Sequence, residues 1–141
     1  MGLTLLCFYF FGIGEMPLTN VSGTYLRVTG IKELKGQLMI AIYDKASDFP
    51  KHDRGVYTIV KKVNSKTMKM DLSPYLTLDK KYAIAVYHDI NENNKLDINI
   101  FGAPTESYGF SNHARGFFSA PDFSEASFFA KNNKLIEITI K

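Results

Sequence analysis

Residues 81–89 (KYAIAVYHD) and residues 37–44 (QLMIAIYD) are the strongest indication of the fold class of this chain. Side chains of an extended strand point alternately to its two faces, and in both stretches the two alternating sets are apolar. In the first stretch these sets are Tyr82, Ile84 and Val86 on one face, and Ala83, Ala85 and Tyr87 on the other. Both stretches are therefore predicted to be central strands, covered by side chains on both faces of a sheet.

Further stretches on either side of this pair alternate with the same period of two. They are residues 23–30, 56–63, 67–72, 126–129 and 134–141. The last of them, for example, is expected to bury Ile136, Ile138 and Ile140 on one face. No segment has a convincing helical period, so the sequence predicts one all-β domain over residues 21–141. About seven strands are enough for an antiparallel two-layer sandwich.

The composition is that of an ordinary globular domain and excludes one class of function. The 141 residues are 45% hydrophobic and 22% charged, with 11 Phe, 8 Tyr and a formal net charge of +3. The basic residues are scattered along the chain, with doublets at residues 61–62 and 80–81. A nucleic-acid groove needs a basic stripe on one face, so no nucleic-acid partner is predicted.

The first 20 residues differ from the rest. Residues 3–13 are almost wholly apolar, which is about the length of a signal-peptide core and too short to span a bilayer. We expect residues 1–20 to be an export leader, although no Lys or Arg precedes the run; the alternative is a buried first strand. Cys7 is the only cysteine and lies in this segment, and Leu6 before it disfavours a lipid anchor.

Residues 89–118 form a long stretch without strand alternation, rich in Asn, Gly and Ser. Loops longer than about 15 residues are uncommon in compact domains unless they are functional or disordered. This one carries several large apolar side chains, among them Ile100, Phe101 and Tyr108. We therefore expect an ordered loop that packs on the sandwich.

The beginning of this loop has the spacing of a calcium-binding loop. With Asp89 as position 1, Asn91, Asn93 and Asp97 fall on positions 3, 5 and 9, and the Lys95 carbonyl on position 7. These residues are the predicted metal ligands. Asn94 stands at position 6, where the left-handed backbone usual for glycine is needed, and Asn adopts it more readily than most residues.

The pattern fails at position 12, where Ile100 replaces the usual bidentate Glu. Glu106 is the closest acid beyond it and could fold back. A loop with so few carboxylates is expected to bind calcium weakly, with a dissociation constant of about 10⁻⁴ to 10⁻³ M. The alternative is a polar turn in which Asn and Asp side chains bond their own backbone without an ion.

Other chemistries have less support. His88 and His113 lie at the two ends of the long loop and allow a transition-metal site, but without a fixed spacing. Ser111 is outside any nucleophile motif, with His113 too close for an ordinary triad. Asp97 and Glu106 are the pair of carboxylates to test for a hydrolase.

Two motifs in this region resemble the bacterial domain-of-unknown-function 2141 family. The first motif comprises His88, Asp89, Asn91, Asn93, Lys95, Leu96 and Asp97, and the second Gly102, Pro104, Glu106, Tyr108, Gly109, Phe110, Ser111, Asn112 and Ala114. The resemblance covers about residues 23 to 141, and the chain departs from the family at Asn94, where Gly is usual. It implies an exported sandwich similar to transthyretin or carboxypeptidase-regulatory domains.

Taken together, these features predict an immunoglobulin/transthyretin-like sandwich in the periplasm, at the cell surface or secreted. The expected role is a non-enzymatic binding or accessory module with a weak calcium-type loop, meeting a protein or glycan at the cell envelope. The alternative is a metal- or carboxylate-dependent hydrolase acting on an extracellular substrate. The expected ligand-binding residues are Glu106, Tyr108, Ser111, Asn112, His113 and Arg115.

Overall fold

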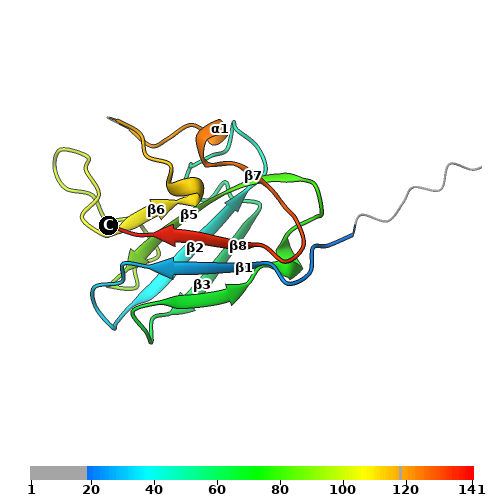
Figure 1. Ribbon diagram of the computed structural model, residues 1–141. Helices are drawn as coiled ribbons and strands as arrows, with labels where there is room; N and C mark the ends of the chain where they lie inside the picture. Colours follow the sequence, from blue (N-terminus) through cyan, green and yellow to red (C-terminus); the bar gives the residue numbers. More distant parts are fainter. Residues whose placement is uncertain (1–18, 118) are drawn as a thin grey trace, which may run out of the picture.

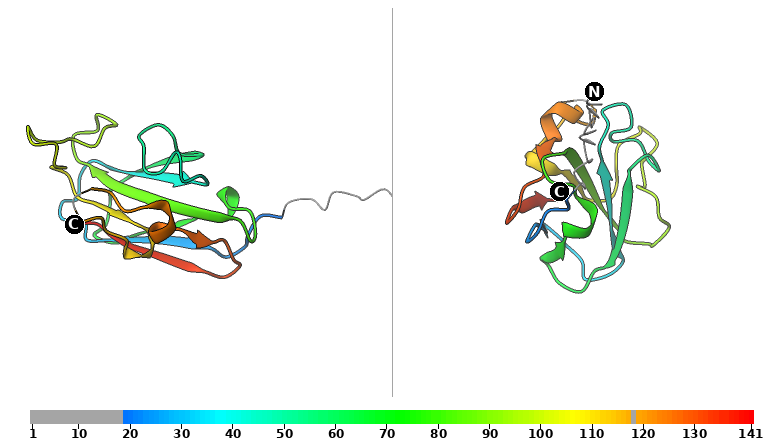
Figure 2. Two further views of the ribbon diagram at one scale, coloured as in Figure 1. Left: turned by 90° about the horizontal axis from the view of Figure 1, so that it is seen from above. Right: turned by 90° about the vertical axis from the view of Figure 1, so that its right-hand side faces the viewer.

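The computed structural model describes residues 19–117 and 119–141. The expected leader, apart from its last two residues, lies outside the described residues, as does Phe118. The described chain forms two β-sheets, which appear as separate layers in Figure 2. The long loop extends from one end of the sandwich, and residues 19–22 lie at the opposite end (Figure 1).

The smaller sheet has three strands in the order β4-β1-β8. Their bounds are Tyr25–Thr29 for β1, Met68–Asp71 for β4 and Leu135–Thr139 for β8. β1 pairs antiparallel with β4 and parallel with β8. The first and last strands of the domain therefore lie side by side.

The larger sheet has five strands, four of them in the order β3-β2-β5-β6. Their bounds are Gln37–Tyr43 for β2, Tyr57–Lys62 for β3, Lys81–Asp89 for β5 and Tyr108–Phe110 for β6. The two-residue strand β7 (Phe128–Phe129) pairs with the beginning of β5. All of β2 pairs with the part of β5 from Ala83 to Asp89, and the two strands form the centre of the sheet, as their sequences predict.

The main core lies between the two sheets. Leu26, Ile40, Ile84 and Ile138 are completely buried there, contributed by four different strands. Each fully buried aliphatic side chain of this kind contributes about 1.5–3 kcal/mol of hydrophobic stabilisation. The expected inward positions of the last strand are confirmed, since Ile136, Ile138 and Ile140 are all buried.

A second, smaller cluster lies on the outer face of the five-stranded sheet. Tyr43, Ala83 and Phe110 are buried there with Phe49 from the turn after β2. The Phe49 ring meets the rings of Tyr43 and Phe110 edge to face, with centroids 5.3 and 5.7 Å apart. This cluster covers part of the outer face and explains why both faces of β2 and β5 are apolar.

The all-β sandwich is confirmed, with eight strands in place of about seven. The additional strand is β6, which lies inside the expected long loop and has only three residues. One strand pair is parallel, where we expected antiparallel pairing throughout. The helical segments are short: η1 (Ser73–Tyr75), η2 (Ser111–His113) and α1 (Phe123–Ala126). Over the described ranges, no helix has the length and apolar character needed to cross a bilayer.

Candidate functional site

Asp89, the last residue of β5, anchors the beginning of the long loop. Its side chain is completely buried, and one carboxylate oxygen accepts a hydrogen bond from the Asn93 backbone amide at 3.1 Å. The other oxygen accepts from the Asn94 amide at 2.8 Å and from Gln37 Nε2 at 2.9 Å. The carboxylate thus holds together the turn that follows it and the neighbouring strand β2.

Asn91, Asn93 and Asp97 form a ring of polar contacts above this anchor. The Asn91 and Asn93 amide groups donate to the two Asp97 carboxylate oxygens at 2.7 and 2.8 Å. Their own side-chain oxygens accept from the backbone two residues later, at Asn93 and Lys95. Asn94 has a positive φ of 61°, the left-handed conformation expected at position 6.

Glu106 does fold back onto this segment. It is 8% exposed, and its two carboxylate oxygens accept from the backbone amides of Ile90 at 3.0 Å and Asp97 at 3.1 Å. Between Asp97 and Glu106 the chain makes a short hairpin, closed by a β-bridge between Ile98 and Pro104. One carboxylate therefore ties both ends of the 89–97 segment, which we call the Asx loop.

The Asx loop has oxygen donors but no dense carboxylate cluster. In the described part of the chain, no three His, Cys, Asp or Glu side chains lie close enough together to hold a metal ion. A calcium ion would need Asn91, Asn93 and the Lys95 carbonyl to turn oxygens toward Asp97. In the structure the Asn91 and Asn93 amide nitrogens, and not their oxygens, face the Asp97 carboxylate.

The expected ligand-binding residues divide into three groups. Ser111 is completely buried; its hydroxyl donates to the Ala126 carbonyl at 2.5 Å and accepts from the Ile84 amide at 2.9 Å. Asn112 donates to the Ser127 carbonyl at 2.6 Å, so these two side chains fasten the loop to its surroundings, as Glu106 does. His113 and Arg115 are exposed, and Tyr108 lines a hollow described below.

The other predicted sites are not brought together in a reactive arrangement. His88 is buried on β5, and its Nε2 lies 2.7 Å from the Lys35 carbonyl oxygen. Glu106 and Asp97, the pair considered for a hydrolase, meet turn amides and Asn side chains, and neither lines the hollow. These groups therefore have structural partners.

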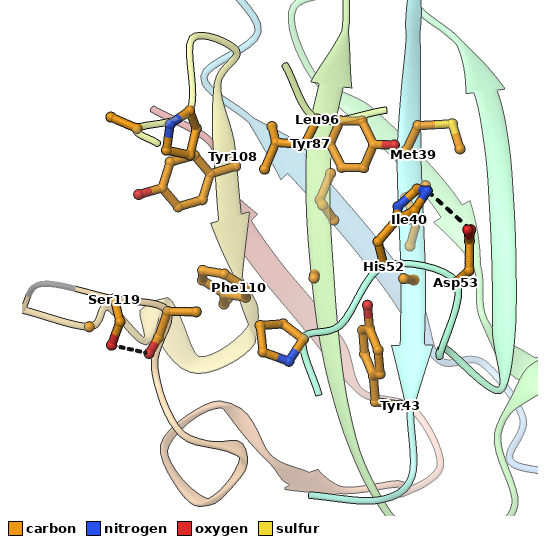
Figure 3. Close-up of a pocket in the computed structure, with 18 of the residues that line it drawn as sticks. Met39, Ile40, Tyr43, His52, Asp53, Tyr87, Leu96, Tyr108, Phe110 and Ser119 are labelled. Atoms are coloured by element: carbon orange, nitrogen blue, oxygen red, sulfur yellow. Dashed lines mark hydrogen bonds and ion pairs between the residues drawn. The ribbon is translucent and has the colours of Figure 1, made fainter. Parts of the chain in front are cut away.

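A hollow of about 740 Å³ lies on the outer face of the five-stranded sheet. We call it the outer-face hollow; its main walls are Met39, Tyr43, Tyr87, Tyr108, Phe110, Leu96, Phe101 and Phe117. Figure 3 shows the rings of Tyr43, Tyr87, Tyr108 and Phe110 arranged around it, with the His52–Asp53 pair at one edge. Its size falls within the usual range of about 300–1,000 Å³ for small-molecule sites.

The strand register explains why the sheet is hollow at this place. Ala41 and Ala85 are direct partners across β2 and β5, and Phe110 follows Ala85 on β6. In the neighbouring row of cross-strand partners on this face, Met39 of β2 lies opposite Tyr87 of β5, and Tyr87 lies opposite Tyr108 of β6. Two adjacent alanines beside a row of large side chains leave a depression in the surface. Sequence reasoning identified this face as apolar but did not single out the two alanines as a floor.

Tyr87 brings one unsatisfied polar atom to the hollow. Its hydroxyl is buried and has no hydrogen-bond partner among the described residues. Burial, reinforced by the negative charges of Asp89 and Glu106, raises the pKa of Tyr87 to about 12. Burial and the charge of Asp53 also raise the pKa of Tyr43 to about 12, although its hydroxyl donates to the Lys51 carbonyl at 3.1 Å.

These raised pKa values predict a loss of stability in alkali. A tyrosine whose pKa is higher in the folded chain than in the unfolded chain stabilises the fold fully below the unfolded value of about 10. That contribution is lost as the pH rises toward the folded pKa of about 12. Urea unfolding between pH 9 and 12, about the range of the transition, should show this decline. It should be shallower in Tyr87→Phe, and an equal slope in that variant would contradict the assignment.

Comparison with known proteins agrees with the two loop motifs. A family model described as "Uncharacterized protein conserved in bacteria (DUF2141)" matches residues 26–137, which include most of both sheets and the long loop. No curated protein and no solved structure matches the chain. The matched residues make up most of the sequence, and the chain belongs to this bacterial family of domain-of-unknown-function 2141 proteins.

Proposed function

We propose that this protein is an exported, non-enzymatic binding module whose Asx loop takes up calcium weakly. The observation that carries the proposal is the convergence of Asn91 and Asn93 on the Asp97 carboxylate, in a loop whose two ends are tied by Glu106. Calcium prefers six to eight oxygen ligands, and a loop with interspersed Asn and Asp supplies them at low affinity. The ligands would be Asp89, Asn91, Asn93, Asp97 and the Lys95 carbonyl.

The contacts of Asp97 support a cation in this loop. Its two oxygens each accept from an Asn amide group, at 2.7 and 2.8 Å, and these neutral donors offer the carboxylate partial positive charges. A divalent ion that replaces these donors would interact more strongly with the carboxylate. Turning the two exposed Asn amides costs little, because neither side chain is packed in the core.

The Asx loop also borders the outer-face hollow, so a calcium ion bound in the loop would influence binding in the hollow. Asn94 and Leu96 belong both to the Asx loop and to the wall of the hollow. Gln37 Nε2 joins the two regions, since it donates to Asp89 at 2.9 Å and to Asn94 Oδ1 at 2.8 Å. An ion that stiffens the loop would fix this wall, and extracellular millimolar calcium matches the weak affinity.

Thermal unfolding of the chelator-treated chain with added calcium tests the proposal. At a calcium concentration 100 times the dissociation constant, the free energy of unfolding should rise by about 2.7 kcal/mol. With a dissociation constant of about 10⁻⁴ M, this needs about 10 mM calcium. The thermal unfolding midpoint should therefore rise as the calcium concentration increases from micromolar to about ten millimolar. Magnesium should have little effect, because Mg²⁺ gives up its bound water molecules reluctantly.

A matched pair of variants separates the loop from general charge effects. Asp97→Asn removes a proposed ligand charge and should strongly reduce the calcium response. Asp79→Asn removes the same charge at a turn near the start of β5, and it should respond as the parent does. A flat response in the folded parent would contradict calcium binding and leave a polar turn closed by its own side chains.

A further inference from the structure

We propose that the end of the sandwich that carries the long loop docks on an anionic phospholipid bilayer, with the tip of the 97–106 hairpin inserted in the bilayer surface. The inserting segment is residues 98–104 (INIFGAP), which we call the apolar tip. The inference rests on the proposed role as a binding module and names its partner. It depends neither on calcium nor on the outer-face hollow.

The apolar tip presents large apolar side chains to water. Ile98 is 62% exposed, Ile100 93% and Phe101 87%, and no residue of the tip is charged. The hairpin extends away from the two sheets, beyond the end of β5 (Figure 1). Exposed apolar surface of this kind marks interaction sites. A protein partner would need a pocket that matches the protrusion, whereas a bilayer surface takes up aliphatic and aromatic side chains without one.

Hydrogen bonds within the hairpin satisfy the backbone amides at its turn. The side-chain oxygen of Asn99 accepts from the amides of Phe101 at 2.9 Å and Ala103 at 3.1 Å. The Asn99 amide donates to the Ala103 carbonyl at 2.8 Å, and the Gly102 amide donates to the Asn99 carbonyl at 3.0 Å. Backbone amides without partners are costly where water is scarce, so these bonds lower the cost of inserting the tip.

Two connections that contain lysines lie at the same end of the sandwich as the hairpin (Figures 1 and 2). They join β1 to β2 (residues 30–36) and β3 to β4 (residues 63–67). Lys66 Nζ donates to the Lys32 carbonyl, which links the two connections. Lys62 at the end of β3 forms an ion pair with a glutamate of the Asx loop. These contacts place the lysines and the hairpin on one side of the molecule.

The charges of this end favour an anionic surface. Lys32, Lys66 and Lys95 are exposed, and in the described ranges none of them forms an ion pair with an acidic side chain. Glu33 and Glu92 are paired with other lysines, and the remaining carboxylates of this end accept from amide groups. The three lysines are therefore available to lipid phosphates, and such contacts strengthen binding within a Debye length of the surface.

A single tryptophan at the tip tests the inference directly, because the chain contains no Trp. Phe101→Trp keeps a large ring, and its fluorescence is followed as unilamellar vesicles are added to the full chain in buffer with chelator. Vesicles of equal parts phosphatidylcholine and phosphatidylglycerol should shift its emission to shorter wavelength, and brominated acyl chains should quench it. Phe129→Trp is the matched control. Phe129 pairs with the beginning of β5, at the opposite end of the sandwich, and a Trp there should show neither change.

Charge variants in the Phe101→Trp chain test the role of the lysines. Lys32→Gln combined with Lys66→Gln removes two unpaired charges and should weaken vesicle binding at least about tenfold. Lys81→Gln combined with Lys131→Gln makes the same change near the beginnings of β5 and β8, and it should bind within about twofold of the parent. Vesicles of phosphatidylcholine alone should bind at least about tenfold more weakly than the anionic vesicles.

Several outcomes would overturn the inference. They are unchanged Phe101→Trp emission in the presence of anionic vesicles, equal quenching of Phe129→Trp, and equal binding to neutral and anionic vesicles. A dimer that sedimentation detects without vesicles, and that Ile100→Ser abolishes, would also overturn it, because the tip would then be a contact between two copies. Calcium melting curves on the same samples keep the proposals apart. Tip quenching without a calcium response removes only the calcium site, and a calcium response without tip quenching removes only the membrane docking.

Discussion

Asp89→Ala is expected to lower the free energy of unfolding by about 3 kcal/mol, because the carboxylate makes several buried hydrogen bonds at once. The change removes the carboxylate acceptor of the Asn94 amide and one of two acceptors of each of the others, since the Asn93 amide also donates to Asn91 Oδ1 and Gln37 Nε2 also donates to Asn94 Oδ1. Gln37 is itself 7% exposed, so water cannot readily replace the lost contact. Urea unfolding followed by circular dichroism would measure the effect as a lower midpoint with an unchanged slope.

Two comparisons make the Asp89 result specific. Asp89→Asn retains one acceptor oxygen and should lose less stability than Asp89→Ala. Asp48→Ala removes a carboxylate for which no side-chain hydrogen bond is found in the described chain, and it should stay within about 0.5 kcal/mol of the parent. If Asp89→Ala were as stable as Asp48→Ala, the Asx loop would not depend on this anchor.

Gly36→Ala is the second change with a large expected effect, about 3 kcal/mol or more, because strain and a steric clash add. Gly36 precedes β2 with a φ of +69°, which L residues rarely adopt. A Cβ at this position would meet the Asp89 carbonyl oxygen and lie 2.7 Å from Ile90 Cα. Both are backbone atoms of the chain entering the Asx loop, so the clash can be relieved only by moving the loop.

Gly102→Ala is the matched control for Gly36→Ala. Gly102 also has a positive φ, +79°, but a Cβ there would have no atom within 4 Å. It should therefore cost only the backbone strain, about 1–2 kcal/mol. Thermal or urea unfolding of the two variants separates the two terms. Equal losses would mean that the close approach of Gly36 to the loop has no energetic consequence.

The regular strands could be predicted because burial imposes a period of two on the side chains. β2 and β5 are apolar on both faces, and β8 alternates, so their places in the sheets follow from the pattern alone. β6 was not predicted, since three residues are too few to display a period and they lie in a segment rich in Gly and Ser. The parallel pairing of β1 with β8 could not be predicted either, because the alternation of apolar and polar side chains within a strand does not specify which strands pair.

The candidate site was predictable only in part, and for the same reason. The Asx loop lies within nine consecutive residues, so its spacing and the left-handed Asn94 could be recognised from the sequence. The sequence allowed Glu106 to fold back onto the loop but did not establish it. A hairpin lies between Glu106 and the backbone amides that donate to its carboxylate, and the sequence does not specify the geometry of that hairpin. Ser111 and Asn112 were expected at a ligand surface, yet their partners are the Ala126 and Ser127 carbonyls, which only folding brings near.

The all-β class, the central strands, the family and the polar loop could be recognised from the amino-acid sequence alone, because each of these depends on neighbouring residues and a short period. Three features depend on the tertiary fold: Ala41 lies opposite Ala85, the Tyr87 hydroxyl has no hydrogen-bond partner among the described residues, and the loop forms a wall beside them. The outer-face hollow depends on the register of three strands and on a loop that folds back over them. Such features arise from contacts between distant residues, which no local pattern in the sequence specifies.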